Sequence, residues 1–484
     1  MGTLASSNLR ARWLLLALVL ALVGGLQAGN RATASTAVVG GDSQAYTAGR
    51  DGGPSHATAY DGEMLTVQAV DVGRQAAEPT VGVDADGNAF FAAGTFDGPG
   101  IVVPQTFVMK STDGGLTWEK TSPTLPNGNA SPPVTLDPYV YTDDTTGRVF
   151  NPELYLGCTY MNFSDDAGAT WVPNPVACGS FVNDHQTIAT GPPPANLKPL
   201  MQVYPNVLYY CFNRVADASC SRSIDGGLTF HPTGSPAFLG FDPANGGLCG
   251  GLHGHIDVGP EGNLYLPKGH CNKPMLGVST DGGTTWTRTL VSDKVPAAST
   301  HLAVEADDAG NVYFVWWGRE DRLPYMAVSR DGGKTFGEPL MIAPPGVAEV
   351  NFPIVTAGEE GRVAIAFPGT TVGDRADKLR PWNHYMVVTD NALAEEPVFL
   401  STTANPLDDP ILRGDCGPGR CGPLWDFQDI QVSAAGGEFW AAVADGCVRT
   451  CVTRGNNYRE SVGQGIAVRQ LSGPLLRPSA ATDG

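Results

Sequence analysis

One eight-residue pattern, S-x-D-x-G-x-T-[WF], occurs five times in this chain of 484 residues. The aspartates of the copies are spaced 53, 59, 56 and 50 residues apart; they are Asp113, Asp166, Asp225, Asp281 and Asp331. A period near 50 that combines turn residues with strand-like sequence is typical of β-propeller blades. A short carboxylate followed by glycine suits a tight hairpin, because the carboxylate accepts backbone N–H bonds and glycine adopts positive φ. We therefore interpret these aspartates as structural, and we expect a degenerate sixth copy at Asp390.

Strand-like sequence precedes each copy, as in THLAVEADDAGNVYFVWWG from Thr300, where two strands flank a glycine turn. Units of this kind begin near Glu78, Asp137, Asp184, Gly254, Thr300, Asn351 and Asp429. The sequence thus predicts an all-β fold, a single β-propeller of seven blades, with six as the alternative because the last two units lack good boxes. The final unit has three strands, so we expect residues 64–70 to supply its outer strand and close the ring.

Four segments follow from this organisation: a signal peptide at 1–34, a flexible leader at 35–63, the propeller at 64–472 and a tail at 473–484. Arg10 and Arg12 precede an apolar run, 13–23, that is too short to span a bilayer. Small residues at 32–34 predict cleavage before Ser35, and cleavage after Ala28 is the alternative. No later segment is apolar enough to cross a membrane. We expect a secreted protein without a membrane span once the signal peptide is removed.

The cysteine count agrees with export, because disulfides persist in oxidising compartments. Ten cysteines fall into five sequence-local couples: Cys158 and Cys178, Cys211 and Cys220, Cys249 and Cys271, Cys416 and Cys421, and Cys447 and Cys451. The even count predicts disulfides, although spacing alone leaves the pairing open and buried free thiols are the alternative. Paired C-x-x-C zinc knuckles are absent from the sequence.

The charge balance excludes one class of partner. Acidic residues number 49 against 30 basic ones, which leaves a net charge of −19 and no basic run that could neutralise a phosphate backbone. We expect no nucleic-acid partner, and we expect a monomer.

The repeated boxes make the chain similar to the Asp-box, or BNR-repeat, propeller superfamily, which includes sialidases. The resemblance covers Glu78 to Leu471 and implies a fold rather than an activity, because the superfamily also holds sortilin-type receptors, xyloglucan-cleaving glucanases and a photosystem assembly factor. Sialidases bind the substrate carboxylate through three arginines, the first in an aromatic-Arg-Ile-Pro motif. The nearest fragments here, EPTV, DPYV and NFPIV, lack that arginine, so the resemblance transfers no catalytic residue.

Four acids near the predicted starts of inner strands are candidates for paired-carboxylate glycoside hydrolysis: Asp137, Asp184, Asp426 and Asp429. Solvated loop acids or turn caps are the alternative. Trp425, which follows the loop DCGPGRCGP, is the candidate for stacking on a sugar ligand.

Three histidines take the same register in consecutive units: His185, His255 and His301, with His253 as a neighbour. Inner strands meet around the propeller axis, so these imidazoles could share a transition metal that keeps an open coordination position. In the alternative interpretation the side chains point between blades and bond to backbone and water.

These patterns favour a secreted binding module that contacts a glycan or an extracellular protein through loops on one face. The alternatives are a sialidase-like exo-glycosidase and a metal-dependent enzyme built on the histidine layer.

Overall fold

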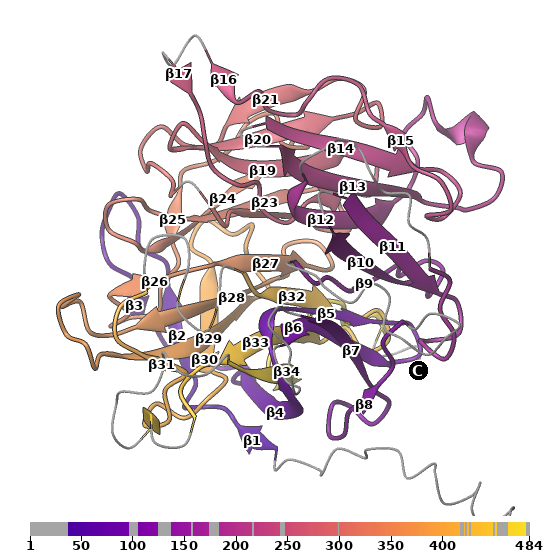
Figure 1. The fold of residues 1–484 in the computed structure, drawn as a ribbon. Helices are drawn as coiled ribbons and strands as arrows, with labels where there is room; N and C mark the ends of the chain where they lie inside the picture. Colours follow the sequence, from indigo (N-terminus) through magenta and orange to yellow (C-terminus); the bar gives the residue numbers. More distant parts are fainter. Residues whose placement is uncertain are drawn as a thin grey trace, which may run out of the picture.

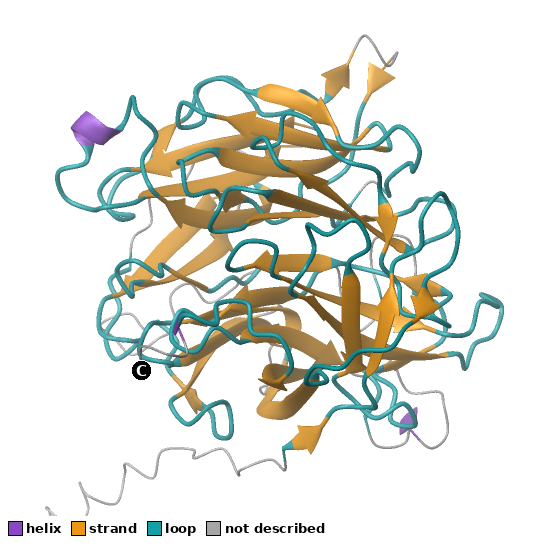
Figure 2. Cartoon of the chain, turned by 180° about the vertical axis from the view of Figure 1, so that it is seen from behind, coloured by secondary structure: helices purple, strands orange, loops and turns teal. Residues whose placement is uncertain are grey.

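The computed structural model describes residues 37–480 apart from 96–104, 124–136, 156–157, 174–182, 215–216, 243–246, 299, 417–420, 422–423, 425–426, 449–450 and 453–462. Strands and loops make up nearly all of this part of the chain (Figure 2), and η1 (Lys198–Leu200) is a short 3-10 turn. Among the described residues, no helix has the length and apolar character that a membrane crossing requires.

Within the described ranges, seven sheets have three or more strands, and we number them in chain order. Sheet 1 consists of β5 (Ala77–Val83), β6 (Ala89–Thr95), β7 (Gln105–Ser111) and β8 (Glu119–Lys120). Sheet 2 consists of β9 (Tyr141–Thr142), β10 (Val149–Tyr155) and β11 (Cys158–Ser164). Sheet 3 consists of β12 (Asp184–Gly191), β13 (Val207–Arg214), β14 (Asp217–Ser223) and β15 (His231–Pro232). Sheet 4 consists of β18 (Asp257–Val258), β19 (Leu264–His270), β20 (Lys273–Ser279) and β21 (Thr287–Leu290). Sheet 5 consists of β22 (Ala303–Ala306), β23 (Val312–Trp317), β24 (Pro324–Ser329) and β25 (Leu340–Met341).

Sheets 6 and 7 are larger because N-terminal strands join them. Sheet 6 consists of β26 (Glu349–Val350), β27 (Ile354–Ala357), β28 (Val363–Thr370), β29 (Pro381–Thr389) and β30 (Val398–Thr403), with β31 (Leu412–Arg413), β2 (Gln44–Thr47) and β3 (His56–Ala57). Sheet 7 consists of β32 (Asp429–Val432), β33 (Phe439–Asp445), β34 (Gln464–Ser472), β4 (Thr66–Gln75) and β1 (Val38–Val39). A separate hairpin pairs β16 (Phe241–Asp242) with β17 (Gly247–Leu248).

The sheets are arranged as the blades of a β-propeller. Their first strands gather around one axis and their last strands lie at the rim (Figure 1); β22 contacts β27, β27 contacts β32, and β32 contacts β5. Second strands such as β6, β19 and β28 are buried along their whole length, because neighbouring sheets cover both faces. The predicted all-β propeller is confirmed, and each sheet begins close to one of the units seen in the sequence.

The N-terminal strand closes the ring, as predicted. β4 pairs antiparallel with β34, with Val70 opposite Ala467 and Ala69 opposite Val468. This pairing gives sheet 7 its outer strand and removes an open edge from the ring.

Residues 37–63, within the range predicted to be a flexible leader, differ from that expectation. β2 pairs with β30 at the rim of sheet 6, and β1 pairs with β4. Tyr46 is fully buried there, and its hydroxyl donates to the carbonyl of Ile342 at 2.8 Å. Composition rich in Gly, Ser and Thr suggested flexibility, but strand pairing and one buried aromatic side chain hold the segment on the propeller.

The five repeated turns share one hydrogen-bond pattern. In the first, the Ser111 hydroxyl donates to Asp113 at 2.8 Å, the amide of Gly115 donates to Ser111 at 2.9 Å, and the Thr117 hydroxyl donates to Asp113 at 2.6 Å. The same bonds recur at Asp166, Asp225, Asp281 and Asp331. These aspartates therefore hold turns.

The degenerate sixth turn uses a residue other than the expected Asp390. The Thr389 hydroxyl donates to the side-chain oxygen of Asn391 at 2.9 Å, and that oxygen also accepts the amide of Val398 at 2.9 Å. Asn391 thus occupies the aspartate position, because its amide oxygen accepts the bond from the hydroxyl two residues before it, as the aspartates do.

Four of the five predicted cysteine couples form disulfides: Cys211–Cys220, Cys249–Cys271, Cys416–Cys421 and Cys447–Cys451. Cys178 and the Cys158 side chain lie outside the described residues.

Candidate functional site in the central cavity

Several residues at the beginning of inner strands adopt a left-handed backbone conformation. His185 has φ of 51°, His301 has 60° and Phe352 has 47°, in sheets 3, 5 and 6. Non-glycine residues rarely adopt this conformation. The sequence register therefore matched His185 with His301 correctly, and their ring centroids lie 5.8 Å apart.

His255 does not join these two rings. The ring next to His185 belongs instead to His253, which lies two residues before His255 in the chain, and the centroids of these two rings are 5.9 Å apart. Of the groups of described His, Cys, Asp and Glu residues, the one whose ligand atoms all lie within 4.8 Å of one another is Asp242, Cys249 and His270. The trio His185, His255 and His301 is therefore not a set of converging ligands in this structure.

His255 instead contacts residues of sheets 2 and 7. Its Nδ1 lies 3.3 Å from Asp429 Oδ1 and 3.4 Å from Tyr139 Oη. Asp429 is fully buried and accepts backbone N–H bonds from Val81 at 3.1 Å and Ile430 at 3.0 Å. Two of the residues singled out in the sequence, His255 and Asp429, thus meet across the axis.

The other predicted acids have different surroundings. Asp137 is buried and accepts the backbone N–H of His185 at 2.9 Å, which links sheets 2 and 3. Asp184 is exposed at the start of β12. Asp426 and the stacking candidate Trp425 lie outside the described residues. Asp137 is therefore a buried acceptor between two sheets rather than a solvated loop acid.

A cavity of about 290 Å³ lies between the inner strands. It contains His255, Tyr139 and Tyr141, and seven carboxylate side chains line it: Asp143, Asp144, Asp257, Glu305, Asp307, Asp308 and Asp429. Asp257 and Glu305 were missed by the sequence reasoning. The signal was present, because Asp257 and Glu305 follow His255 and His301 by two and four residues, which are same-face spacings in a strand.

Burial shifts the ionisation of these two carboxyl groups. It raises the pKa of Asp257 to about 6, although the N–H of Ala306 donates to Asp257 Oδ2 at 2.8 Å. Burial, and then the negative charge of Asp257, raise the pKa of Glu305 well above its ordinary value. A carboxyl group with a raised pKa retains its proton to higher pH and can donate a hydrogen bond.

The C-terminal segment brings one cation to this cavity. Arg477 donates to Asp144 at 2.8 Å and to Asp308 at 3.2 Å. The buried side chain of Leu476 anchors the segment, whose backbone bonds to Gly437 and Glu359 at 2.8 Å. The predicted tail therefore packs across one end of the cavity, and Arg477 joins sheets 2 and 5 there.

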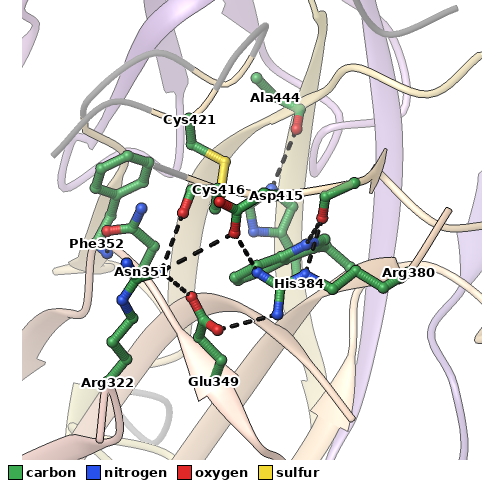
Figure 3. The surroundings of a disulfide bond; sticks show 12 residues. Arg322, Glu349, Asn351, Phe352, Arg380, His384, Asp415, Cys416, Cys421 and Ala444 are labelled. Atoms are coloured by element: carbon green, nitrogen blue, oxygen red, sulfur yellow. Dashed lines mark hydrogen bonds and ion pairs between the residues drawn. A yellow bond between two sulfur atoms is a disulfide. The ribbon is translucent and has the colours of Figure 1, made fainter. Parts of the chain in front are cut away.

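A second arginine cluster surrounds a carboxylate of the chain itself. Arg375 and Arg380 each donate to Glu349 Oε2 at 3.0 Å. Arg322 donates to Oε1, and Figure 3 shows Arg322 and Arg380 on either side of Glu349. Burial opposes ionisation, but these bonds lower the pKa of Glu349 below its ordinary value. Arg380, fully buried, also binds Asp415 beside the Cys416–Cys421 disulfide. Glu349 thus pairs with all three arginines, and two of them also bond to Asp415 and to the carbonyl of Cys416 beside the disulfide.

No family model and no curated protein matches the chain. Solved structures with a similar fold include a protein of unknown function from Dyadobacter fermentans, with 15% identity over 85% of this chain and 99% of that one and a TM-score of 0.45. YCF48 from Cyanidioschyzon merolae has 11% identity over 85% and 99%, with a TM-score of 0.44. The Hadza microbial sialidase Hz136 has 15% identity over 72% of both chains, with a TM-score of 0.40.

Proposed function

We propose that this chain is an extracytoplasmic Asp-box propeller that binds a neutral glycan in its central cavity. The observation that carries the proposal is the lining of the cavity, in which seven carboxylates face two tyrosines and Arg477 is already paired with Asp144 and Asp308. Sugar hydroxyl groups donate well to carboxylates, in charge-assisted hydrogen bonds. The four disulfides and the predicted signal peptide support export.

The cavity volume and charge restrict the ligand. About 290 Å³ is at the small end of the roughly 300–1,000 Å³ found for ligand pockets, which suits a short saccharide. An anionic sugar would place its carboxylate among like charges, where a pair 4 Å apart repels by about 4 kcal/mol at an effective dielectric constant of about 20. The charge of the lining therefore favours neutral sugars and disfavours a sialidase-type substrate.

Binding to a panel of neutral glycans and sialosides, measured by isothermal titration calorimetry, tests this proposal. We expect binding of a neutral glycan that falls at least tenfold in the Asp257→Asn, Glu305→Gln double variant. Glu395→Gln, Glu396→Gln is the matched control, because both are exposed carboxylates outside the cavity lining and their replacement removes the same number of carboxyl groups. Preference for sialosides, or equal affinity in all three proteins, would count against the proposal.

Glycoside hydrolysis is the second candidate function, and the raised pKa of Glu305 favours it specifically. Hydrolysis needs one protonated carboxyl group to donate to the leaving oxygen and a second group to act as base or nucleophile. In this scheme Glu305 is the acid, and Asp257 or the His255–Asp429 pair is the base. Mass spectrometry of the bound glycan after incubation separates the two functions, since cleaved product that disappears in Glu305→Gln indicates catalysis.

A further inference from the structure

The Cys249–Cys271 disulfide lies beside a histidine and an aspartate that the proposed function does not use. Asp242, Cys249 and His270 each offer a ligand atom, and these atoms all lie within 4.8 Å of one another. His270 Nε2 is 3.5 Å from Asp242 Oδ2. Cys271 is bonded to Cys249, so a second sulfur adjoins this three-residue group.

Two hairpins hold these four side chains. Asp242 ends β16, and Cys249 follows β17 directly, with its N–H donating to the carbonyl of Gly240 at 2.7 Å. His270 ends β19, and the turn to β20 has positive φ at both Cys271 and Asn272, as in a tight type I′ turn. The ligands therefore come from closed hairpins rather than from long loops.

We propose that reduction of the Cys249–Cys271 disulfide converts this cluster into a zinc site with the ligands Cys249, Cys271, His270 and Asp242. Two thiolates, one imidazole and one carboxylate are a tetrahedral donor set that suits Zn²⁺. The site is independent of the central cavity and of glycan binding.

The chemistry requires a reductant and a metal. A dithiol supplies two electrons and two protons and becomes a disulfide, whereas a phosphine supplies two electrons and becomes a phosphine oxide, with water giving the oxygen atom and the two protons. In either case the S–S bond of the chain breaks and two thiols form. Zn²⁺ then displaces both thiol protons, because the thiolate is the ligand. The oxidised and the zinc-bound forms are mutually exclusive, since the same sulfur atoms serve both.

The surroundings fit a bound metal. Cys249 and His270 are buried, and the Phe238 ring lies 5.2 Å from the His270 ring, whereas Asp242 and Cys271 are partly exposed and leave the cluster accessible to zinc. Lys268 and Arg288 lie close enough to act electrostatically on His270. Two thiolates and Asp242 carry three negative charges against two on zinc, and these cations balance the excess.

Cysteine alkylation mapped by peptide mass spectrometry tests the site in the full-length chain. After reduction with a phosphine, we expect Zn²⁺ to slow N-ethylmaleimide labelling of Cys249 and Cys271 at least tenfold, with no effect on Cys447 and Cys451. Asp242→Ala should reduce the protection, and Cys447→Ser/Cys451→Ser should leave it unchanged.

A second readout uses Co²⁺ as a spectroscopic probe, with tryptophan emission to establish that the reduced chain stays folded. Thiolate-to-cobalt charge-transfer absorption should appear in the reduced chain and vanish in Cys249→Ser/Cys271→Ser. Equal labelling rates with and without zinc, protection spread over all cysteines, or cobalt absorption that survives the double variant would overturn the proposal.

Discussion

Replacing Asp257 by asparagine should stabilise the protein in a pH-dependent way. The folded-state pKa of Asp257 is about 6, against an ordinary value of 3.8. Above pH 6 the folded chain must hold an ionised carboxylate in an unfavourable place. As the pH falls from 6 to 3.8, the folded chain takes up a proton that the unfolded chain does not, and stability rises.

The size of the effect follows from these two values. Their difference corresponds to about 3 kcal/mol at pH 7 and above, an upper bound because the cavity admits water that screens the charge. Asparagine keeps an oxygen that can accept the N–H of Ala306. Asp257→Asn should therefore exceed the wild type in unfolding free energy by up to about 3 kcal/mol at pH 8, and the gain should vanish near pH 4.

Urea unfolding of both proteins at pH 8, 6 and 4 measures this difference. A difference that stays constant with pH, or a variant that is less stable at pH 8, would refute the assigned burial of the Asp257 charge. Glu396→Gln should show no comparable pH-dependent gain, because Glu396 is exposed.

Three further predictions concern the same framework. Arg477→Ala should raise the pKa of Asp257 above 6, because Arg477 lowers it, and carboxylate infrared titration should show the shift. Trp118→Ala should cost about 3–5 kcal/mol in urea unfolding, because Trp118 is buried against Phe91; a cost below about 1 kcal/mol would contradict its packing role. Gly254→Ala should destabilise by at least about 1–3 kcal/mol, since its Cβ would meet the Leu302 carbonyl oxygen and force the inner strands of sheets 4 and 5 apart; an unchanged melting temperature would show that they do not pass so closely.

The repeats made the fold predictable, because each serine–aspartate turn is local in sequence and fixes the position of its sheet. Closure by β4 was also predictable, since a three-strand final unit needs a partner. The order of residues 37–63 depends on long-range contacts, the pairing of β1 with β4 and of β2 with β30 and the burial of Tyr46, and composition does not reveal such contacts.

The candidate site was predictable only in part. Strand register placed His185 beside His301, but His255 lies against Asp429 and Tyr139, apart from that pair. The same-face spacing from His255 and His301 could have identified Asp257 and Glu305 as cavity residues. The sequence could not identify Arg477, because its ion pairs with Asp144 and Asp308 depend on where the C-terminal segment packs.

A crystal structure of the protein with the tightest-binding neutral glycan tests the central claim most directly. The account predicts the sugar in the central cavity, with its hydroxyl groups within hydrogen-bond distance of Asp257 and Glu305. A sugar bound on an outer surface, with the cavity carboxylates uncontacted, would contradict it.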